Sequence, residues 1–165
     1  MMKITVREIA FYGILSALAV FAGYIETLFA IPSPVAGVKI GIGNIVVLYA
    51  LCIRGKKCAV IVCIVKVLAC ALLFGNIMTM LYSASGAFLS LAAMITAVRF
   101  TRAGIVGISM LGGVFHNVGQ VMCACAFLGA VTMIYLPFLA AVGGVCGALT
   151  GAAAAVIVRR TEGHL

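Results

Sequence analysis

The chain has 165 residues, of which 66% are hydrophobic and only 8% are charged. Soluble domains carry roughly 25% charged residues, and a soluble chain of this length would expose too much surface to water for such a composition. The composition therefore predicts an integral membrane protein. The net charge of +8 is typical of loops that set membrane topology. Without a basic stripe or an aromatic platform, this charge does not indicate nucleic-acid binding.

The acidic residues exclude several classes of enzyme. The sequence contains no aspartate and only three glutamates, Glu8, Glu26 and Glu162. Prenyl synthases hold Mg²⁺ on a diphosphate with paired Asp clusters, and P-loop ATPases need an acidic metal partner and a glycine-rich phosphate loop ending in Gly-Lys. The chain has neither feature. We therefore expect a protein that is not an enzyme and does not hydrolyse ATP by itself.

Apolar runs that end at charges, Gly or Pro predict six spanning helices, since a span needs about 17–25 residues. The second run is short, and we expect it to include part of residues 35–39. The chain shows no linker or repeat, so residues 1–165 are predicted to form a single all-α membrane domain. The expected spans cover about residues 6–31, 40–53, 58–74, 77–98, 104–127 and 137–158.

The basic residues predict the orientation of this six-helix bundle. With the N-terminus inside, all of the 11 basic residues except Lys39 and Lys66 lie at cytoplasmic helix ends. The opposite orientation would violate the positive-inside rule at every loop. Both termini are therefore expected in the cytoplasm, with the bundle in the cell membrane.

Small residues recur at helical spacing on two spans. Gly143, Gly147 and Gly151 lie on one face of the sixth span, and small residues let helices approach closely. On the first span, Gly13 with Ala17 and Ala19 with Gly23 repeat the same spacing of four. Two interpretations stay open, namely packing within the bundle and docking of a partner membrane subunit.

Ionisable residues within a span are costly and indicate function. Glu26 lies near the outer end of the first span, and a structural pair with Lys39 or Lys66 is its simpler explanation. Lys39 lies outside, where it could instead extend to the lipid headgroups, and Asn44 follows one turn inward. Lys66 lies about 13 Å from its cytoplasmic helix end, so we expect it to face the bundle interior, bound to Glu26 or to an anionic ligand.

The fifth span carries a second polar group. His116, Asn117 and Gln120 share one helix face through their spacing of three and four. Polar side chains at this depth need partners, so they either link helices or contact a ligand. A metal site is not predicted, because no second His or acid stands near His116. The seven cysteines lie in or at the start of apolar runs and are expected to act as small buried hydrophobes.

Several of these strings occur in the same order in a known family. The chain resembles the Gx transporter family, which is also described as heptaprenyl diphosphate synthase component I. The Gly-x-Lys-x-Gly-x-x-Asn string and the His-Asn-x-x-Gln string are the more specific pieces. The matching segments are residues 24–26, 32–34, 37–44, 85–90 and 116–120.

That family is in turn similar to the six-helix substrate-binding (S) components of energy-coupling factor (ECF) transporters. The resemblance implies a ligand near the outer face, under the loop between the first two helices, which would contain Lys39. It also implies docking onto a shared transmembrane (T) subunit and its ATPases, partly through small residues of the first helix. The candidate docking residues are Gly13, Ala17, Ala19 and Gly23.

We therefore expect a membrane subunit that binds a small molecule, such as a vitamin or a cofactor precursor, for uptake. One alternative is a transmembrane redox subunit that uses flavin or quinone, although no cofactor is evident from the residues. Another is a non-catalytic accessory of isoprenoid or quinone synthesis. The predicted ligand-binding residues are Glu26, Lys39, Asn44, Lys66, His116, Asn117 and Gln120.

Overall fold

A computed structural model describes residues 5–28 and 41–162 of the chain, and in this part it is helical. Five of its helices are long and apolar enough to cross a membrane. Helices suit a membrane interior because they satisfy every backbone hydrogen bond within one segment. The elements are α1 (Val6–Leu28), α2 (Ile42–Arg54), α3 (Lys56–Phe74), α4 (Ile77–Phe100), α5 (Ile105–Leu128), a 3₁₀ helix η1 (Ala130–Tyr135) and α6 (Leu136–Glu162).

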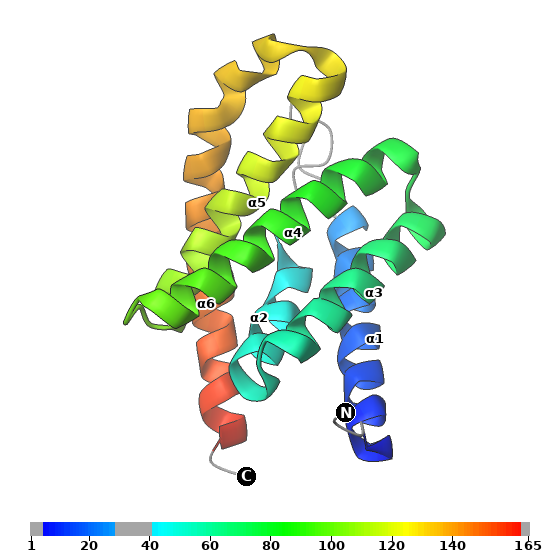
Figure 1. The fold of residues 1–165 in the computed structure, drawn as a ribbon, viewed down its shortest axis with the longest axis vertical. Coiled ribbons are helices and arrows are strands. Elements are labelled where there is room, and N and C mark those ends of the chain that lie inside the picture. The colour runs from blue at the N-terminus through cyan, green and yellow to red at the C-terminus, as the bar shows by residue number, and fades with distance from the viewer. Residues whose placement is uncertain (1–4, 29–40, 163–165) are drawn as a thin grey trace.

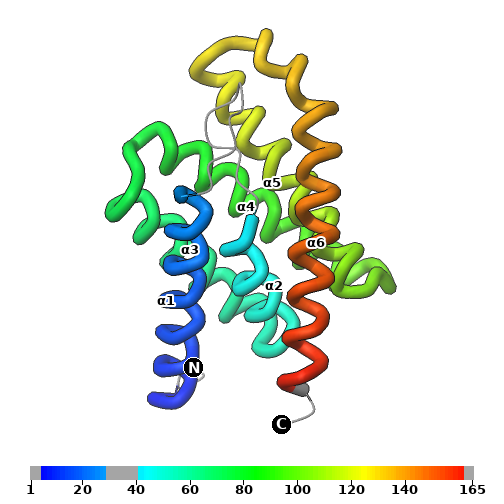
Figure 2. Tube along the Cα trace, turned by 180° about the vertical axis from the view of Figure 1, so that it is seen from behind, coloured from blue at the N-terminus to red at the C-terminus, as the bar shows by residue number. Residues whose placement is uncertain are grey.

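The helices form two groups that lie side by side (Figures 1 and 2). One group contains α1, α2 and α3, which contact one another in every pairing. The other contains α4, α5 and α6, in which α5 contacts both neighbours extensively. Contacts of α3 with α4 and of α2 with α6 join the groups. The short helix α2 is thereby enclosed by long ones.

Helix α2 differs from the other five in length. Its 13 residues rise only about 20 Å, whereas the hydrocarbon core of a bilayer is about 30 Å thick. The described part of α2 therefore does not cross a membrane by itself. The segment 35–40, which we expected to lengthen this span, lies outside the described residues. The six-span count stays a prediction.

Basic residues gather at one end of the bundle. The first and last described residues lie at this end, together with the α2–α3 and α4–α5 connections (Figure 1). Of the Lys and Arg residues in the described ranges, only Lys66 lies away from this basic end. The basic end carries Arg7, Arg54, Lys56, Lys57, Arg99, Arg102, Arg159 and Arg160.

Short connections fix the helix ends. Gly55 alone joins α2 to α3, and its φ of 79° falls in the left-handed region that favours glycine. At the opposite end, Asn76 begins α4 with a capping box, in which its side chain accepts from the Thr79 N–H and the Thr79 hydroxyl accepts from the Asn76 N–H. These contacts satisfy backbone donors that a helix start leaves unpaired.

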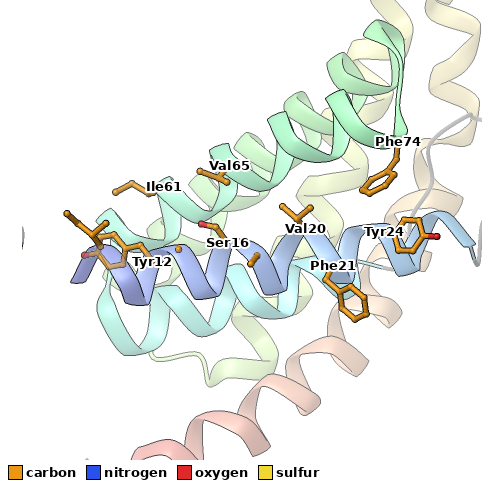
Figure 3. A pocket seen from close by; sticks show the side chains of 11 residues that line it. Tyr12, Ser16, Val20, Phe21, Tyr24, Ile61, Val65 and Phe74 are labelled. Carbon is orange, nitrogen blue, oxygen red and sulfur yellow. The ribbon is translucent and has the colours of Figure 1, made fainter. Parts of the chain in front are cut away.

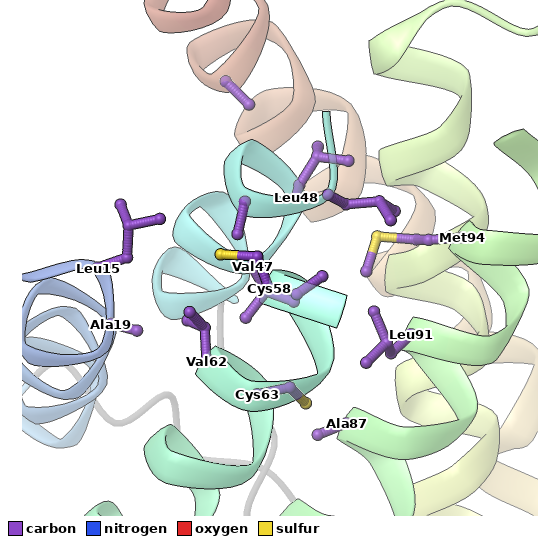
Figure 4. Packing of buried hydrophobic residues seen from close by; sticks show 14 of the residues in the cluster. Leu15, Ala19, Val47, Leu48, Cys58, Val62, Cys63, Ala87, Leu91 and Met94 are labelled. Carbon is purple, nitrogen blue, oxygen red and sulfur yellow. The ribbon is translucent and has the colours of Figure 1, made fainter. Parts of the chain in front are cut away.

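Two apolar clusters lie on either side of a polar layer. The larger cluster draws mainly on α1, α2, α3 and α4, with Ile108 of α5 and Ala154 of α6, and includes Leu15, Val47, Val62 and Leu91 (Figure 4). A smaller cluster near the opposite end contains Tyr82, Val121, Ala124 and Leu139. The buried polar side chains of α5 lie between the two clusters along the chain. The fully buried Cys58 and the nearly buried Cys63 belong to the larger cluster.

The glycines of α6 pack against α5 rather than facing outward. A Cβ at Gly147 would lie 2.6 Å from the Ser109 carbonyl oxygen, and one at Gly151 would lie 2.6 Å from the Ser109 Cβ. A Cβ at Gly113 would meet the backbone of Gly143. Only glycine allows this approach of backbones. Packing within the bundle is therefore confirmed for the Gly143, Gly147 and Gly151 face.

Candidate functional site

Two buried charged residues bind the first turn of α2. The Lys66 Nζ of α3 donates to the Asn44 Oδ1 at 2.9 Å. The Glu26 Oε1 of α1 accepts from the Gly43 N–H at 3.3 Å. Glu26 is 4% exposed and Lys66 is 8% exposed. The first turn of α2 thus lies between a carboxylate and an ammonium that come from different helices.

The local backbone explains why this turn attracts a carboxylate. Gly41 precedes α2 in the left-handed conformation, with φ of 90°, and has no side chain to cap the helix. A helix start leaves backbone N–H groups unpaired and carries partial positive charge. Glu26 supplies the missing acceptor from another helix. No ion pair between Glu26 and Lys66 occurs in the described part of the chain, so their direct pairing is replaced by two contacts with α2.

Gly43 provides the space for the lysine side chain. A Cβ at Gly43 would lie 2.5 Å from the Lys66 Cε and 2.6 Å from its Nζ. The aliphatic part of the Lys66 side chain therefore lies across Gly43, and its ammonium group reaches the side chain of the next residue, Asn44. Gly23 of α1 is also close, since a Cβ there would lie 3.8 Å from the Lys66 Cε. Small residues on two helices thus shape the space that Lys66 occupies.

A small polar cavity, here called the lysine cavity, opens beside this contact. Its volume is only about 10 Å³, which is at the lower limit for one water molecule. Four of the predicted ligand-binding residues line it, which shows that the fold brings them together. The lining residues are Gly23, Glu26, Gly41, Asn44, Lys66, Cys70, Ser83 and His116.

A second small cavity, here called the serine cavity, lies among α2, α4, α5 and α6. It has a volume of about 20 Å³ and shares Gly41, Asn44 and His116 with the lysine cavity. Its polar lining includes Ser109 and Thr150, whose hydroxyl groups lie 3.2 Å apart. The Ser90 hydroxyl also lines it. Ser90 is 2% exposed, and its Oγ makes no hydrogen bond to any described residue.

The polar face of α5 is buried in full, but its three residues differ in their surroundings. His116 lines both small cavities. Asn117 lines the serine cavity and donates to the Leu139 carbonyl oxygen at 2.6 Å, so it links α5 to α6. Gln120 lines neither cavity, and its Cγ lies 2.9 Å from the position of a Cβ on Gly86 of α4. Lys39 lies outside the described residues.

Sequence reasoning missed the hydroxyl groups of the site. Ser83 and Ser90 of α4 lie seven residues apart, which places them on one helix face, and Ser109 and Thr150 approach from α5 and α6. Single Ser and Thr residues are common in spanning helices because they can bond to their own backbone. The spacing of Ser83, Gly86 and Ser90, which places them on one face of α4, could have indicated a polar face on this helix.

The lining groups define what the site can do chemically. It offers hydroxyl, amide and imidazole groups together with one buried cation and one buried anion. Such groups bind and orient a polar molecule through hydrogen bonds. Within residues 5–28 and 41–162, no three His, Cys, Asp or Glu side chains come close enough to hold a metal ion.

A large apolar groove runs between α1 and α3 on the outside of the bundle, and we call it the α1–α3 groove. Its volume is about 770 Å³. Val20 and Phe74 extend toward it from the two helices (Figure 3), and the Tyr24 and Phe74 rings close one end with centroids 4.7 Å apart. The groove is lined by Ile9, Tyr12, Gly13, Ser16, Ala17, Val20, Phe21, Tyr24, Ile61, Val65 and Phe74.

The four candidate docking residues of α1 lie on two different faces. Gly13 and Ala17 are exposed and line the α1–α3 groove. Ala19 is fully buried in the apolar cluster, and a Cβ on Gly23 would lie 2.7 Å from the Cys70 Sγ. The chain's own helices therefore cover Ala19 and Gly23. Of the four candidates, only Gly13 and Ala17 therefore lie on the exposed surface of α1.

Comparison with known proteins agrees with the resemblance noted in the sequence. No curated protein and no solved structure shows a significant match to the chain. A family model described as heptaprenyl diphosphate synthase component I matches residues 15–157, a range that includes both small cavities and five of the six α-helices in full or nearly so. The chain therefore belongs to the heptaprenyl diphosphate synthase component I family.

Proposed function

We propose that the chain is the substrate-binding membrane subunit of an uptake transporter of the energy-coupling factor type. The observation that carries the proposal is the burial of Glu26 and Lys66 around the first turn of α2. Ionisable side chains within a bilayer cost several kcal/mol and are retained chiefly for function. A purely structural bundle could hold α2 with apolar residues at these positions.

The lining favours a small ligand that is neutral or anionic and rich in hydrogen-bonding groups. Lys66 supplies a cation, and the serine hydroxyls with Asn117 and His116 supply neutral donors and acceptors. A vitamin or a cofactor precursor fits this description. Asn44 and His116 border both small cavities, so a ligand that moves them apart would join the two cavities into one site.

The distribution of charge supports an orientation for this subunit. The basic end of the bundle is expected in the cytoplasm by the positive-inside rule. Glu26 lies close to the opposite end of α1, and Asn44 lies in the first turn of α2. The ligand would therefore enter from outside the cell. Lys39, one of the predicted ligand-binding residues, is expected on this outer side.

Energy for transport would come from partner proteins. The chain lacks an ATP-binding loop and any aspartate, so we propose that a transmembrane subunit and its ATPases assemble with it. The α1–α3 groove, with Gly13 and Ala17 exposed in it, is the surface that we assign to the transmembrane subunit. Exposed small residues let another helix approach closely.

The description of the family supports a second candidate. A component of heptaprenyl diphosphate synthesis could assist a soluble prenyl synthase at the membrane. Without aspartate, the chain cannot supply the carboxylate pairs that hold Mg²⁺ on a diphosphate. The chain would then be a non-catalytic accessory, and the catalytic partner would be a separate protein.

Native mass spectrometry separates these candidates. The chain would be extracted in mild detergent from the membranes of cells that produce it, and its bound masses and partners identified. Uptake predicts a small-molecule adduct together with a membrane subunit and ATPases. Copurification with a soluble prenyl synthase, without an adduct, would instead support the accessory role. A bound flavin or quinone that the purified protein reduces and reoxidises, seen as a reversible change in absorbance, would overturn both in favour of a redox subunit.

A further inference from the structure

A second groove lies between α4 and α5, far from the α1–α3 groove, and we call it the arginine groove. Its volume is about 400 Å³, which falls within the range of about 300–1,000 Å³ that small-molecule sites occupy. We propose that this groove binds an acyl chain of an anionic phospholipid, whose phosphate Arg99 and Arg102 bind. The lining residues are Leu89, Ala92, Ala93, Thr96, Ala97, Phe100, Thr101, Leu111 and Phe115.

The shape of the arginine groove suits a hydrocarbon chain. Small side chains at Ala92, Ala93 and Ala97 leave room along α4, and Phe100 and Phe115 add aromatic surface. Phe100 is 75% exposed, although it is among the largest apolar side chains of the molecule. An acyl chain in the groove would cover apolar surface on both helices. The lining contains no charged side chain that would repel it.

The length of the groove along α4 is close to the thickness of one leaflet of a bilayer. Along α4 it extends from Thr101 to Leu89, which is about 18 Å at 1.5 Å per residue. Half of the hydrocarbon core of a bilayer is about 15 Å thick. Thr101 belongs to the α4–α5 connection, between Arg99 and Arg102 in the sequence, so the groove begins beside these two arginines at the basic end and runs along α4 away from it. An acyl chain follows the same course.

The charges at the mouth of the groove select the headgroup. The Arg99 guanidinium carbon lies 5.5 Å from the centroid of the Phe100 ring, so the cation is held against a groove-lining residue. Arg102 is exposed in the α4–α5 connection. Residues 76–129 contain no Asp or Glu, and these arginines therefore have no acidic partner on the helices that form the groove. Arginine binds phosphate through paired hydrogen bonds.

The basic end of α6 provides a matched control. Arg159 and Arg160 are exposed in its last turn and line neither the arginine groove nor the α1–α3 groove. General attraction of anionic lipid to basic helix ends acts on both arginine pairs alike. A groove-specific site depends on Arg99 and Arg102 alone. The two double variants remove equal charge and so separate these explanations.

The test is native mass spectrometry of the purified full chain in micelles that contain equal amounts of phosphatidylglycerol and phosphatidylcholine. The wild type is expected to retain one phosphatidylglycerol preferentially. The Arg99→Gln/Arg102→Gln variant should lose that preference by at least tenfold, because it removes the charge-assisted hydrogen bonds to the phosphate, while Arg159→Gln/Arg160→Gln should keep it. Equal loss in both variants, or loss in neither, would overturn the proposal.

A third variant tests the acyl chain separately from the headgroup. Ala92 is exposed in the groove, so Ala92→Phe fills the groove without a change of charge or a clash in the core. This variant should also lose phosphatidylglycerol. Retention at the wild-type level would show that the headgroup binds without the groove. Displacement of phosphatidylglycerol from the wild type by inorganic phosphate would show the same. Either result overturns the acyl-chain site.

Discussion

Glu26 on α1 and Lys66 on α3 bind successive residues of one helical turn, at the Gly43 N–H and the Asn44 side chain. The two charges therefore act on the start of α2 rather than on each other. Asn44 accepts one of the three N–H groups of the Lys66 ammonium, but the lysine cavity beside it has room for about one water molecule. Under the proposed function, a ligand larger than water would therefore reach Lys66 only after this turn or its neighbours move.

The first prediction concerns Lys66. The Lys66→Met variant retains the volume of the side chain but removes the buried charge, whose desolvation is costly. Its thermal midpoint should stay at or above that of the wild type, while the retention of a small-molecule adduct in native mass spectrometry falls at least tenfold. Lys66→Arg, which keeps the charge, should retain part of the adduct. A loss of several degrees in Lys66→Met would contradict a binding role for the ammonium.

The second prediction uses a pair of glycines on α1 and α2. In Gly43→Ala the new Cβ would meet the Lys66 side chain and displace it from Asn44. Loss of this hydrogen bond from a charged group costs about 1.5–3 kcal/mol, which outweighs the roughly 0.5–1 kcal/mol that alanine gains in helix propensity. Gly13→Ala has open space around its Cβ and should raise stability by about 0.5–1 kcal/mol through helix propensity. Thermal unfolding followed by circular dichroism measures both. The same sign for both variants would refute the contact.

The sequence predicted the helical architecture well because membrane helices follow from long apolar runs that charges interrupt. It also predicted that Lys66 and His116 face the interior, since a charge at that depth cannot reach water. Sequence alone did not predict how Glu26 is satisfied. Its acceptor role depends on where α2 begins, and the start of α2 follows from the conformation of Gly41 rather than from an apolar run.

The two faces of α1 show a further limit of prediction. Gly13 and Ala19 differ by six positions, which corresponds to about 120° around a helix. In a soluble protein, polar residues would mark the outer face. In a membrane both faces are apolar, so the spacing of small residues looks the same whether they face lipid or a neighbouring helix. The burial of Ala19 and Gly23 became visible only through α2 and α3.

The third prediction concerns Ser90. Its buried hydroxyl has no hydrogen-bond partner among the described residues, a situation that costs roughly 1–3 kcal/mol. Ser90→Ala should therefore raise the thermal midpoint and weaken adduct retention if the hydroxyl contacts ligand. Ser109→Ala is the control, because it breaks a 3.2 Å contact with Thr150 and should lower the midpoint. Lower stability in Ser90→Ala would contradict the assignment.

The fourth prediction concerns the contact between α5 and α6. Gly147→Ala would place a Cβ 2.6 Å from a backbone oxygen of Ser109, whereas the Cβ in Gly144→Ala would lie at an ordinary 3.6 Å from a Val114 methyl group. The former should destabilise the bundle by about 1–3 kcal/mol, and the latter should change stability little. Chemical denaturation in detergent measures the difference. Equal midpoints would show that the two helices can separate without cost.

The fifth prediction tests the surface of α1. Gly13→Leu would fill part of the α1–α3 groove without a clash inside the chain. The purified chain should fold as the wild type does, but capture of the proposed transmembrane subunit from native membranes should fall at least fivefold, as expected when more than about 1 kcal/mol of interface energy is lost. Ala152→Leu, on an exposed face of α6, is the control and should leave capture unchanged.

The glycine contacts of α5 and α6 have a mechanical consequence. Where the backbones of two helices touch at Gly113, Gly143 and Gly147, no side chain can change rotamer to absorb a displacement. We therefore expect the two helices to move together as one rigid body. Any movement that enlarges the small cavities would then have to come from the other helices. Helix α2 is the first candidate, because side-chain contacts from Glu26 and Lys66 hold its first turn in place.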